Sequence, residues 1–232
     1  MSVINTNITA LIGQNNLSNS QAMLSKAQER LSSGLRINSA SDDAAGQAIA
    51  NRMSAQITGM QQAQRNTNDG ISLAQTMEGG LNQISDNLQR IRELATQAAN
   101  DTNTSADRSS IALEIQERID EIDRVSEATT FNGTALLSGT VATLNIQVGA
   151  NIEDADSIEV DTFDASSAAL GVSALSVGAF ASAQTAIDAI DTALQDIDDQ
   201  RATLGATLNR FDSVLENLNT NITNLSEARS RI

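Results

Sequence analysis

The C-terminal end of the chain carries a long, narrow stripe of apolar residues, and this stripe restricts the folds that the chain can adopt. From Ile187 to Ile232 the apolar side chains recur at alternating spacings of three and four, and only Arg201 and Arg229 interrupt them. The stripe consists of Ile187, Ile190, Leu194, Ile197, Leu204, Leu208, Phe211, Leu215, Leu218, Ile222, Leu225 and Ile232. A mean spacing of about 3.5 residues keeps one seam of a helix against a partner helix, as in a coiled coil. The sequence therefore predicts a long helix over residues 182–232, with Leu208 and Leu215 buried in the seam.

The composition argues against an enzyme. The chain has no His and no Cys, which removes the usual imidazole base, the thiol nucleophile and the ligands of a soft metal site. Neighbouring acids can catalyse glycoside hydrolysis, and the closest pairs are Asp42–Asp43, Asp154 with Asp156, and Asp198–Asp199. The first pair is better explained as a helix start and the others as solvated surfaces. We therefore expect no catalytic site, no metal and no cofactor.

Charge and hydropathy narrow the choice of partners. The net charge is −15, so nucleic acid and anionic membrane surfaces would repel the chain, and neither is an expected partner. No run of about 18 apolar residues is present to span a membrane. The segment Met1–Thr6 lacks the basic start of an ordinary signal peptide. Aromatic residues make up only 2% of a chain that is 40% hydrophobic, a composition that suits thin seams between helices better than a thick core.

The order of the predicted elements indicates a mainly α fold, an elongated rod of long coiled-coil-like helices with a small β-hairpin. A weakly amphipathic segment over residues 1–42 precedes a long helix over about 43–100, which would extend about 80 Å at a rise of about 1.5 Å per residue. A shorter helix at 105–129, a hairpin at about 141–161 and an Ala/Ser-rich connector at 164–181 follow. The two long helices could run parallel or antiparallel. These patterns favour a structural or filament role over a binding module, and a binding module over an enzyme.

Five runs of sequence resemble the bacterial flagellin family, in the order in which that family has them. The first is Leu31-Ser-Ser-Gly-Leu-Arg-Ile-Asn-Ser-Ala-Ser-Asp-Asp-Ala-Ala-Gly46. The other four are Gln83–Asn100, Thr130–Gly133, Arg201–Ala206 and Ala228–Ile232. Because the runs extend over nearly the whole chain, the resemblance is specific although no single run would decide it.

The resemblance implies a secreted, extracellular subunit of the bacterial flagellum that assembles with other flagellin subunits. Residues 1–42 would supply an inner-core segment along the filament axis, and residues 43–232 an outer rod domain. The apolar stripe reaches Ile232 without a helix stop signal, and the family continues beyond that position, so we expect the C-terminal inner helix to be missing. The export chaperone is expected to bind poorly for that reason. The large surface domains of many flagellins are also expected to be missing.

The resemblance further implies recognition by the flagellin-sensing Toll-like receptor. The matching positions are Gln89, Arg90, Leu94, Gln97 and Glu114. Arg90 can donate paired hydrogen bonds, Leu94 can fill an apolar pocket, and Glu114 can pair with cations. The alternative for these residues is a solvated Arg90–Glu114 pair with Leu94 at the edge of a seam. Alternatives for the whole chain are a flagellar hook–filament junction or cap protein, or another coiled-coil secreted protein such as an adhesin or a needle subunit.

Overall fold

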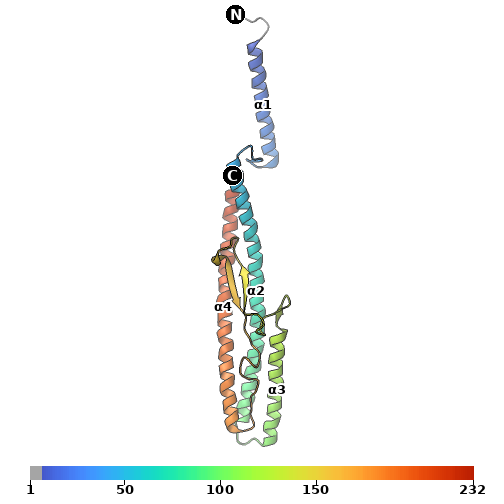
Figure 1. Cartoon of the computed structure of the whole chain (residues 1–232), viewed down its shortest axis with the longest axis vertical. Coiled ribbons are helices and arrows are strands. Elements are labelled where there is room, and N and C mark those ends of the chain that lie inside the picture. The colour runs from blue at the N-terminus through green and yellow to red at the C-terminus, as the bar shows by residue number, and fades with distance from the viewer. Residues whose placement is uncertain (1–6) are drawn as a thin grey trace. The chain divides into compact units, whose positions relative to one another are not determined.

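The structure is a computed structural model that describes residues 7–232, and it is mainly α, as predicted (Figure 1). Residues 1–6 lie outside the described residues. They are the Met1–Thr6 segment considered above as a signal peptide, and they begin the predicted inner-core segment. The four α-helices of the described part are α1 (Ile8–Ser33), α2 (Ala44–Ala98), α3 (Ser105–Ala128) and α4 (Phe180–Arg231). The strands are β1 (Thr130–Phe131), β2 (Thr134–Ala135), β3 (Thr143–Gln147) and β4 (Ser157–Asp161), with a 3-10 turn at Asp154–Asp156.

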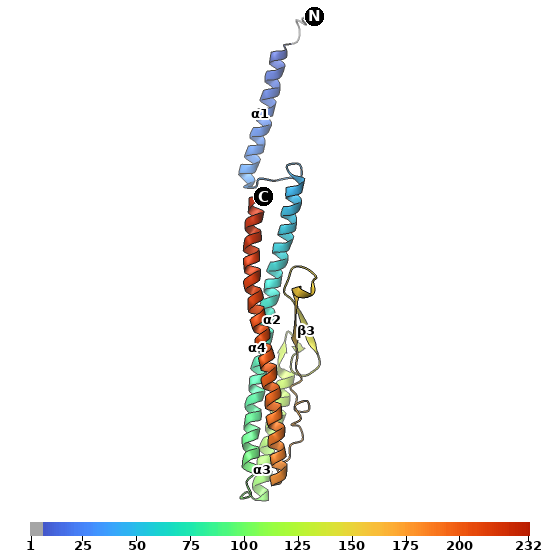
Figure 2. The same cartoon turned by 90° about the vertical axis from the view of Figure 1, so that its left-hand side faces the viewer.

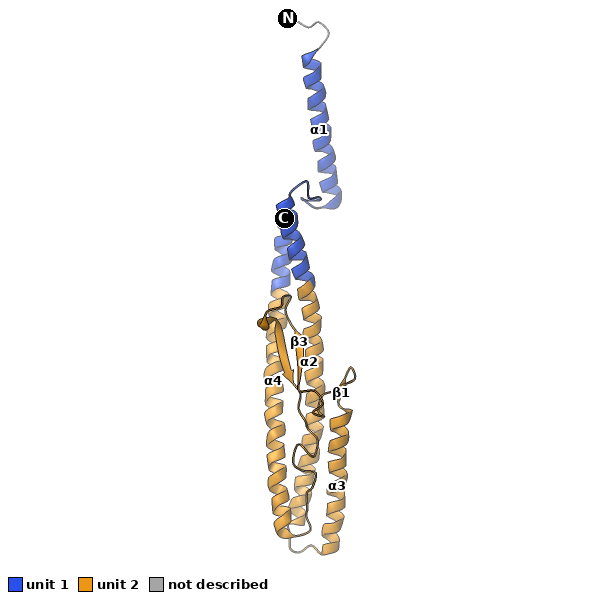
Figure 3. Ribbon diagram, viewed as in Figure 1, with its two compact units in different colours: residues 1–58, 221–232 blue, residues 59–220 orange. Residues whose placement is uncertain are grey.

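The chain forms two compact units (Figure 3). Unit 1 comprises Met1–Thr58 and Asn221–Ile232, and unit 2 comprises Gly59–Thr220. Both α2 and α4 contribute residues to each unit. The predicted division after residue 42 concerns packing within a filament and stays a prediction.

In unit 2 the helices α2 and α4 lie side by side and run antiparallel (Figure 2). Gln64 donates a hydrogen bond to Asn219, and Arg92 donates to Asp191, so residue numbers rise along α2 as they fall along α4. Between these contacts lies an apolar core from which water is excluded. Its fully enclosed side chains include Met77, Leu81, Ile84, Leu88, Ile91, Ile122, Ile190, Ile197 and Phe211. The structure thereby decides the direction that the sequence had left open.

The buried seam of α4 differs in phase from the prediction. Leu204, Phe211 and Leu218 are buried, whereas Leu208 and Leu215 are only partly buried. The prediction that the latter two lie buried in the seam was therefore wrong. A stripe with spacings of three and four offers two candidate lines of contact, and only the packing of α2 and the hairpin decides which of them faces inward.

Helix α3 begins at a reciprocal cap. The hydroxyl of Thr104 accepts from the main-chain N–H of Asp107 at 3.3 Å, and the Asp107 carboxylate accepts from the N–H of Thr104 at 2.9 Å. These bonds satisfy two N–H groups that a helix start would otherwise leave unpaired. The buried face of α3 carries Ile111, Ile115, Ile119 and Ile122 at spacings of four, four and three. The cap and the spacing together account for a helix that starts at Ser105.

After α3 the chain makes a tight hairpin between β1 and β2. Asn132 and Gly133 have φ values of 48° and 81°, the left-handed pair that a two-residue turn of this kind requires. The predicted hairpin follows as β3 and β4, which pair antiparallel with Leu144 opposite Val160 and Ile146 opposite Ile158. On its apolar face Ile158 and Val160 are buried and Leu144 and Ile146 are partly buried, while the outward side chains of β3 are exposed.

The Ala/Ser-rich segment 164–181 is more than the connector that the sequence suggested. Leu170, Val172 and Val177 are buried in the core of unit 2. Asp123 on α3 accepts hydrogen bonds from the main-chain N–H of Ser167 at 2.7 Å and from its hydroxyl at 2.8 Å. The segment therefore covers one side of the bundle and is fastened to α3.

In unit 1, α1 ends at Ser33 and is capped by Gly34, whose φ of 69° lies in the left-handed region. The following turn is organised by Asp42. Its carboxylate accepts from the main-chain N–H groups of Asn38 and Ser39 at 3.3 Å each and lies 2.6 Å from the ammonium of Lys26. Asp43 then caps α2 by accepting from the N–H of Gly46 at 3.0 Å.

Helix α1 has no buried residue, and its apolar side chains are exposed. Leu17 and Leu24 are 60% and 61% exposed, and Leu31 is 88% exposed. A helix of this length without tertiary packing is marginal in water, so its apolar side chains need a partner.

Two adjacent glycines in α2 give a matched test of packing. A Cβ added to Gly79 meets nothing within 4 Å, whereas one added to Gly80 would lie 2.7 Å from Leu137 Cδ1 and 2.8 Å from Thr129 Oγ1. We expect Gly79→Ala to raise the free energy of unfolding by about 0.5–1 kcal/mol through helix propensity. Gly80→Ala should lower it, because overpacking costs about 1–3 kcal/mol. Urea denaturation followed by circular dichroism measures both, and an equal gain in the two variants would contradict the close approach of Leu137.

The turn at Asp42 should respond to acid. The hydrogen bond from Lys26 is the largest cause that lowers the pKa of Asp42 from 3.8 to about 2. Because this pKa is depressed in the folded state, its stabilising contribution is complete above pH 3.8 and is lost as the pH falls through 2. The amide resonances of Asn38 and Ser39 should titrate with a midpoint near 2. In Lys26→Gln the midpoint should move up, and an unchanged midpoint would show that Lys26 does not hold the carboxylate.

Candidate functional site

Arg90 forms the centre of a charged cluster between α2 and α3. Its Nε and Nη2 donate to Glu114 Oε1 at 3.1 and 2.9 Å, and its Nη1 donates to Glu93 Oε2 at 3.0 Å. Both carboxylates raise the pKa of Arg90, and Glu114 has the larger effect. The Arg90 side chain nevertheless remains 45% exposed, so its guanidinium is held by two carboxylates and still reaches the surface.

The structure brings together two of the five predicted receptor-binding residues, Arg90 and Glu114, in a direct ion pair. Gln89 and Gln97 are exposed on α2. Leu94 is only 3% exposed and belongs to the core of unit 2. An apolar contact of Leu94 with a partner therefore has almost no surface to use in this conformation.

Two charged partners near this cluster were not singled out from the sequence. Glu93 lies three residues after Arg90, a spacing at which helix side chains meet, so the sequence did contain that signal. Asp191 accepts from Arg92 Nε at 2.5 Å and from Nη2 at 3.2 Å. The pKa of Asp191 is lowered by this hydrogen bonding. Because Arg92 and Asp191 are far apart in the sequence, only the tertiary fold reveals this pair.

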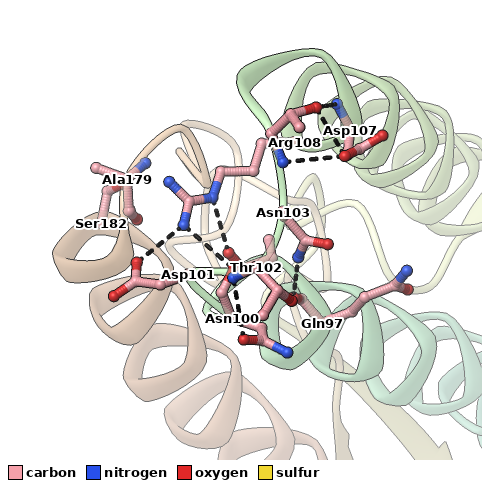
Figure 4. Close-up of polar contacts among 11 residues, drawn as sticks. Gln97, Asn100, Asp101, Thr102, Asn103, Asp107, Arg108, Ala179 and Ser182 are labelled. Atoms are coloured by element: carbon pink, nitrogen blue, oxygen red, sulfur yellow. Dashed lines mark hydrogen bonds and ion pairs between the residues drawn. The ribbon is translucent and has the colours of Figure 1, made fainter.

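The corner between α2 and α3 is held by Arg108 (Figure 4). Its Nε donates to the main-chain carbonyl of Ala98 at 3.1 Å, and its Nη2 donates to the carbonyl of Asn100 and the carboxylate of Asp101, both at 3.2 Å. The side-chain amide of Asn103 donates to the carbonyl of Gln97 at 2.6 Å. The carbonyls of Gln97 and Asn100 also accept main-chain N–H bonds from Asn100 and Asn103, at 3.2 and 3.1 Å, so side-chain and main-chain donors together hold the turn between α2 and α3.

The carboxylates of the cluster are engaged by guanidinium groups. Each of its carboxylates accepts from a guanidinium, and a guanidinium cannot act as a base at neutral pH. Among residues 7–232, no three carboxylates gather closely enough to hold a metal ion. Within the same part of the chain, no helix has both the length and the apolar character needed to cross a bilayer.

Two sequence-family models match the chain. The bacterial flagellin N-terminal helical region matches residues 4–142, and the bacterial flagellin C-terminal helical region matches residues 187–232. The phase 2 flagellin of Salmonella typhimurium strain LT2 is 57% identical over 192 residues, which cover 83% of this chain and 36% of that protein. A flagellin of Xenorhabdus nematophila is 61% identical over 150 residues, which cover 65% of this chain and 48% of that protein. The chain thus spans less than half the length of these relatives.

Solved structures agree with this relationship. The crystal structure of Bacillus cereus flagellin is 39% identical with a TM-score of 0.59, and the similarity covers 66% of this chain and 88% of that one. A putative flagellar hook-associated protein from Vibrio parahaemolyticus has a TM-score of 0.69 over 84% of this chain and 100% of its own, but at 18% identity it shows the fold alone. Because the N-terminal model alone extends over more than half of the residues, this chain belongs to the bacterial flagellin family, a family of structural proteins rather than enzymes.

Proposed function

We propose that this chain is a structural subunit of the bacterial flagellar filament that assembles with other flagellin subunits outside the cell. Membership of the flagellin family supports the proposal. The observation that carries it is the bare apolar surface of α1, on which Leu17, Leu24 and Leu31 are all at least 60% exposed. Contact with helices of other subunits would remove this surface from water, and each large aliphatic side chain buried in this way contributes about 1.5–3 kcal/mol.

Assembly is tested by sedimentation and electron microscopy of the complete gene product. We expect it to form long filaments that pellet, because assembly buries the apolar face of α1 between subunits. Replacing Leu17 and Leu24 of the complete protein by Gln should abolish the pellet. The matched control is replacement of Leu113 on α3, which is 71% exposed, by Gln. Filaments that form equally well from the α1 variant would contradict the role of this helix.

We also propose that the charged cluster around Arg90 is recognised by the flagellin-sensing Toll-like receptor. Support comes from its geometry, because Glu93 and Glu114 hold the guanidinium in one orientation while much of it remains exposed. An ordered arginine loses little conformational freedom on binding, and arginine is enriched among residues that dominate interface energies. Gln89 and Gln97 would add polar contacts at the rim, and Leu94 would support the helix surface from beneath.

Receptor activation by purified variants tests this second proposal. Arg90→Ala should weaken binding about thirtyfold if Arg90 is a dominant contact, with little loss of helicity. Arg124→Ala is the matched control, because Arg124 also forms an ion pair with a glutamate three residues away and is 62% exposed. Equal potency of Arg90→Ala and the parent would show that the cluster is an ordinary solvated surface.

A further inference from the structure

The turn between β1 and β2 places Asn132 directly before Gly133, and this is the one Asn-Gly pair in the sequence. Both residues are exposed, with φ values of 48° and 81°. A Cβ added to Gly133 would meet nothing within 4 Å, so the space around the turn is open. Asparagine is among the thermolabile residues of proteins, and glycine has no side chain to shield the main-chain nitrogen beside it. The turn therefore brings a labile amide next to an accessible nitrogen.

No hydrogen bond restrains either of these two groups. Among residues 7–232, the side-chain amide of Asn132 has no hydrogen-bond partner, and neither has the main-chain N–H of Gly133. The amide carbon and the nitrogen that would attack it are thus free to approach each other without breaking a bond.

Asn38 provides the contrast, because it is also exposed, also lies outside the helices and also precedes a small residue. Its side-chain amide donates to Glu29 Oε1 at 2.7 Å. The main-chain N–H of Ser39, which follows it, donates to the carboxylate of Asp42 at 3.3 Å. Both groups that would have to react at Asn38 are therefore held in place.

A change of turn type brings the two groups at Asn132 together. In a type I′ turn the first central residue has a ψ of about +30°, which keeps its side chain away from the next nitrogen. Flipping the peptide plane between Asn132 and Gly133 produces a type II′ turn, in which that ψ is about −120°. At that angle the Cα–Cβ bond of an L-residue eclipses the following C–N bond. This is the arrangement that a five-membered ring requires.

The hairpin allows this flip without unfolding. The φ of the first central residue is positive in both turn types, so only ψ of Asn132 and φ of Gly133 change. Glycine adopts φ values of either sign. Both turns join strands through two residues and suit their twist, so Phe131 stays paired with Thr134. The flipped turn is a minor state, because residues other than glycine rarely occupy that part of φ/ψ space.

We propose that Asn132 is a site of spontaneous deamidation in the folded protein. The main-chain nitrogen of Gly133 gives its proton to water or hydroxide and bonds to Cγ of Asn132. The bond from Cγ to the amide nitrogen breaks, and ammonia leaves after taking up a proton. Water then adds to one carbonyl of the resulting succinimide and breaks the bond from that carbonyl to the ring nitrogen. In sum, one water is consumed, one ammonia is released and the amide becomes a carboxylate.

The two possible products differ in their effect on the hairpin. Opening at Cγ gives an aspartyl residue, which tolerates a positive φ as asparagine does and adds one negative charge to the turn. Opening at the main-chain carbonyl gives an isoaspartyl residue, which lengthens the main chain by one carbon and no longer fits a two-residue turn. Strand β2 leads directly into the buried Leu136, whose N–H donates to the carbonyl of Thr129 at 3.1 Å. The isoaspartyl form should loosen this contact.

Deamidation is tested by incubating the folded protein in mildly alkaline water enriched in heavy oxygen, followed by peptide mapping with mass spectrometry. The heavy oxygen marks carboxylates that form during the incubation. We expect Asn132 to lose its amide at least about tenfold faster than Asn38, which corresponds to a barrier about 1.4 kcal/mol lower. Equal rates at the two asparagines would overturn the proposal.

A parallel incubation in urea separates reaction in the folded turn from reaction after unfolding. The folded protein should react at Asn132 within about tenfold of the rate of the unfolded chain. An amide that is lost in urea but persists in the folded protein would overturn the proposal, because the turn would then protect it.

Hydrogen exchange at the amide of Leu136 tests the consequence for the hairpin. This amide should exchange faster in the isoaspartyl fraction than in the parent, whereas Asn132→Asp, which keeps the normal main chain, should exchange as the parent does. Faster exchange in Asn132→Asp as well, or in neither form, would contradict the link between chain length and loosening.

Discussion

The antiparallel contact between α2 and α4 is the interaction on which the rest of the structure depends. Burial of each large aliphatic or aromatic side chain contributes about 1.5–3 kcal/mol, and the contact buries one at nearly every turn of both helices in unit 2. Exposed ion pairs such as Arg92–Asp191 add little energy, but they favour one register of the two helices. The hairpin, α3 and the 164–181 segment each cover a side of this pair. Without it, none of them has a surface to pack against.

Much of this arrangement could be predicted from the sequence, because long helices have a regular spacing of apolar residues. The mainly α class, the long helices and the alternating strands of the hairpin follow from spacing and turn residues. The phase of the α4 seam could not be predicted, since Leu208 and Phe211 both fit the pattern and only neighbouring elements distinguish them. The packed character of residues 164–181 was hidden as well. Its few apolar residues have no regular period, and its attachment to Asp123 joins parts of the chain far apart in sequence.

The charged cluster was found by resemblance to a family and not by physical reasoning. Sequence spacing can reveal a helical neighbour such as Glu93, but the pairing of Arg90 with Glu114 requires that α2 and α3 fold back on each other. That fold-back is set by the carbonyl bonds of Arg108, whose role depends on the position of main-chain atoms. Leu94 was assigned a receptor contact from the family resemblance alone. Its burial shows that such an assignment also needs the packing around the residue in the fold.

The way in which α4 completes the core has a consequence for the order of folding. Side chains of α2 such as Ile84 and Leu88 share one core with Ile190 and Ile197, about a hundred positions later in the chain. Contacts between such distant residues form late, because closing a long loop costs entropy before any contact repays it. A chain that appears from its N-terminus first can make single helices and the α2–α3 corner, but it cannot close the bundle until residues beyond 190 arrive. The N-terminal part of the polypeptide therefore lacks its closed core until most of the chain is available for folding.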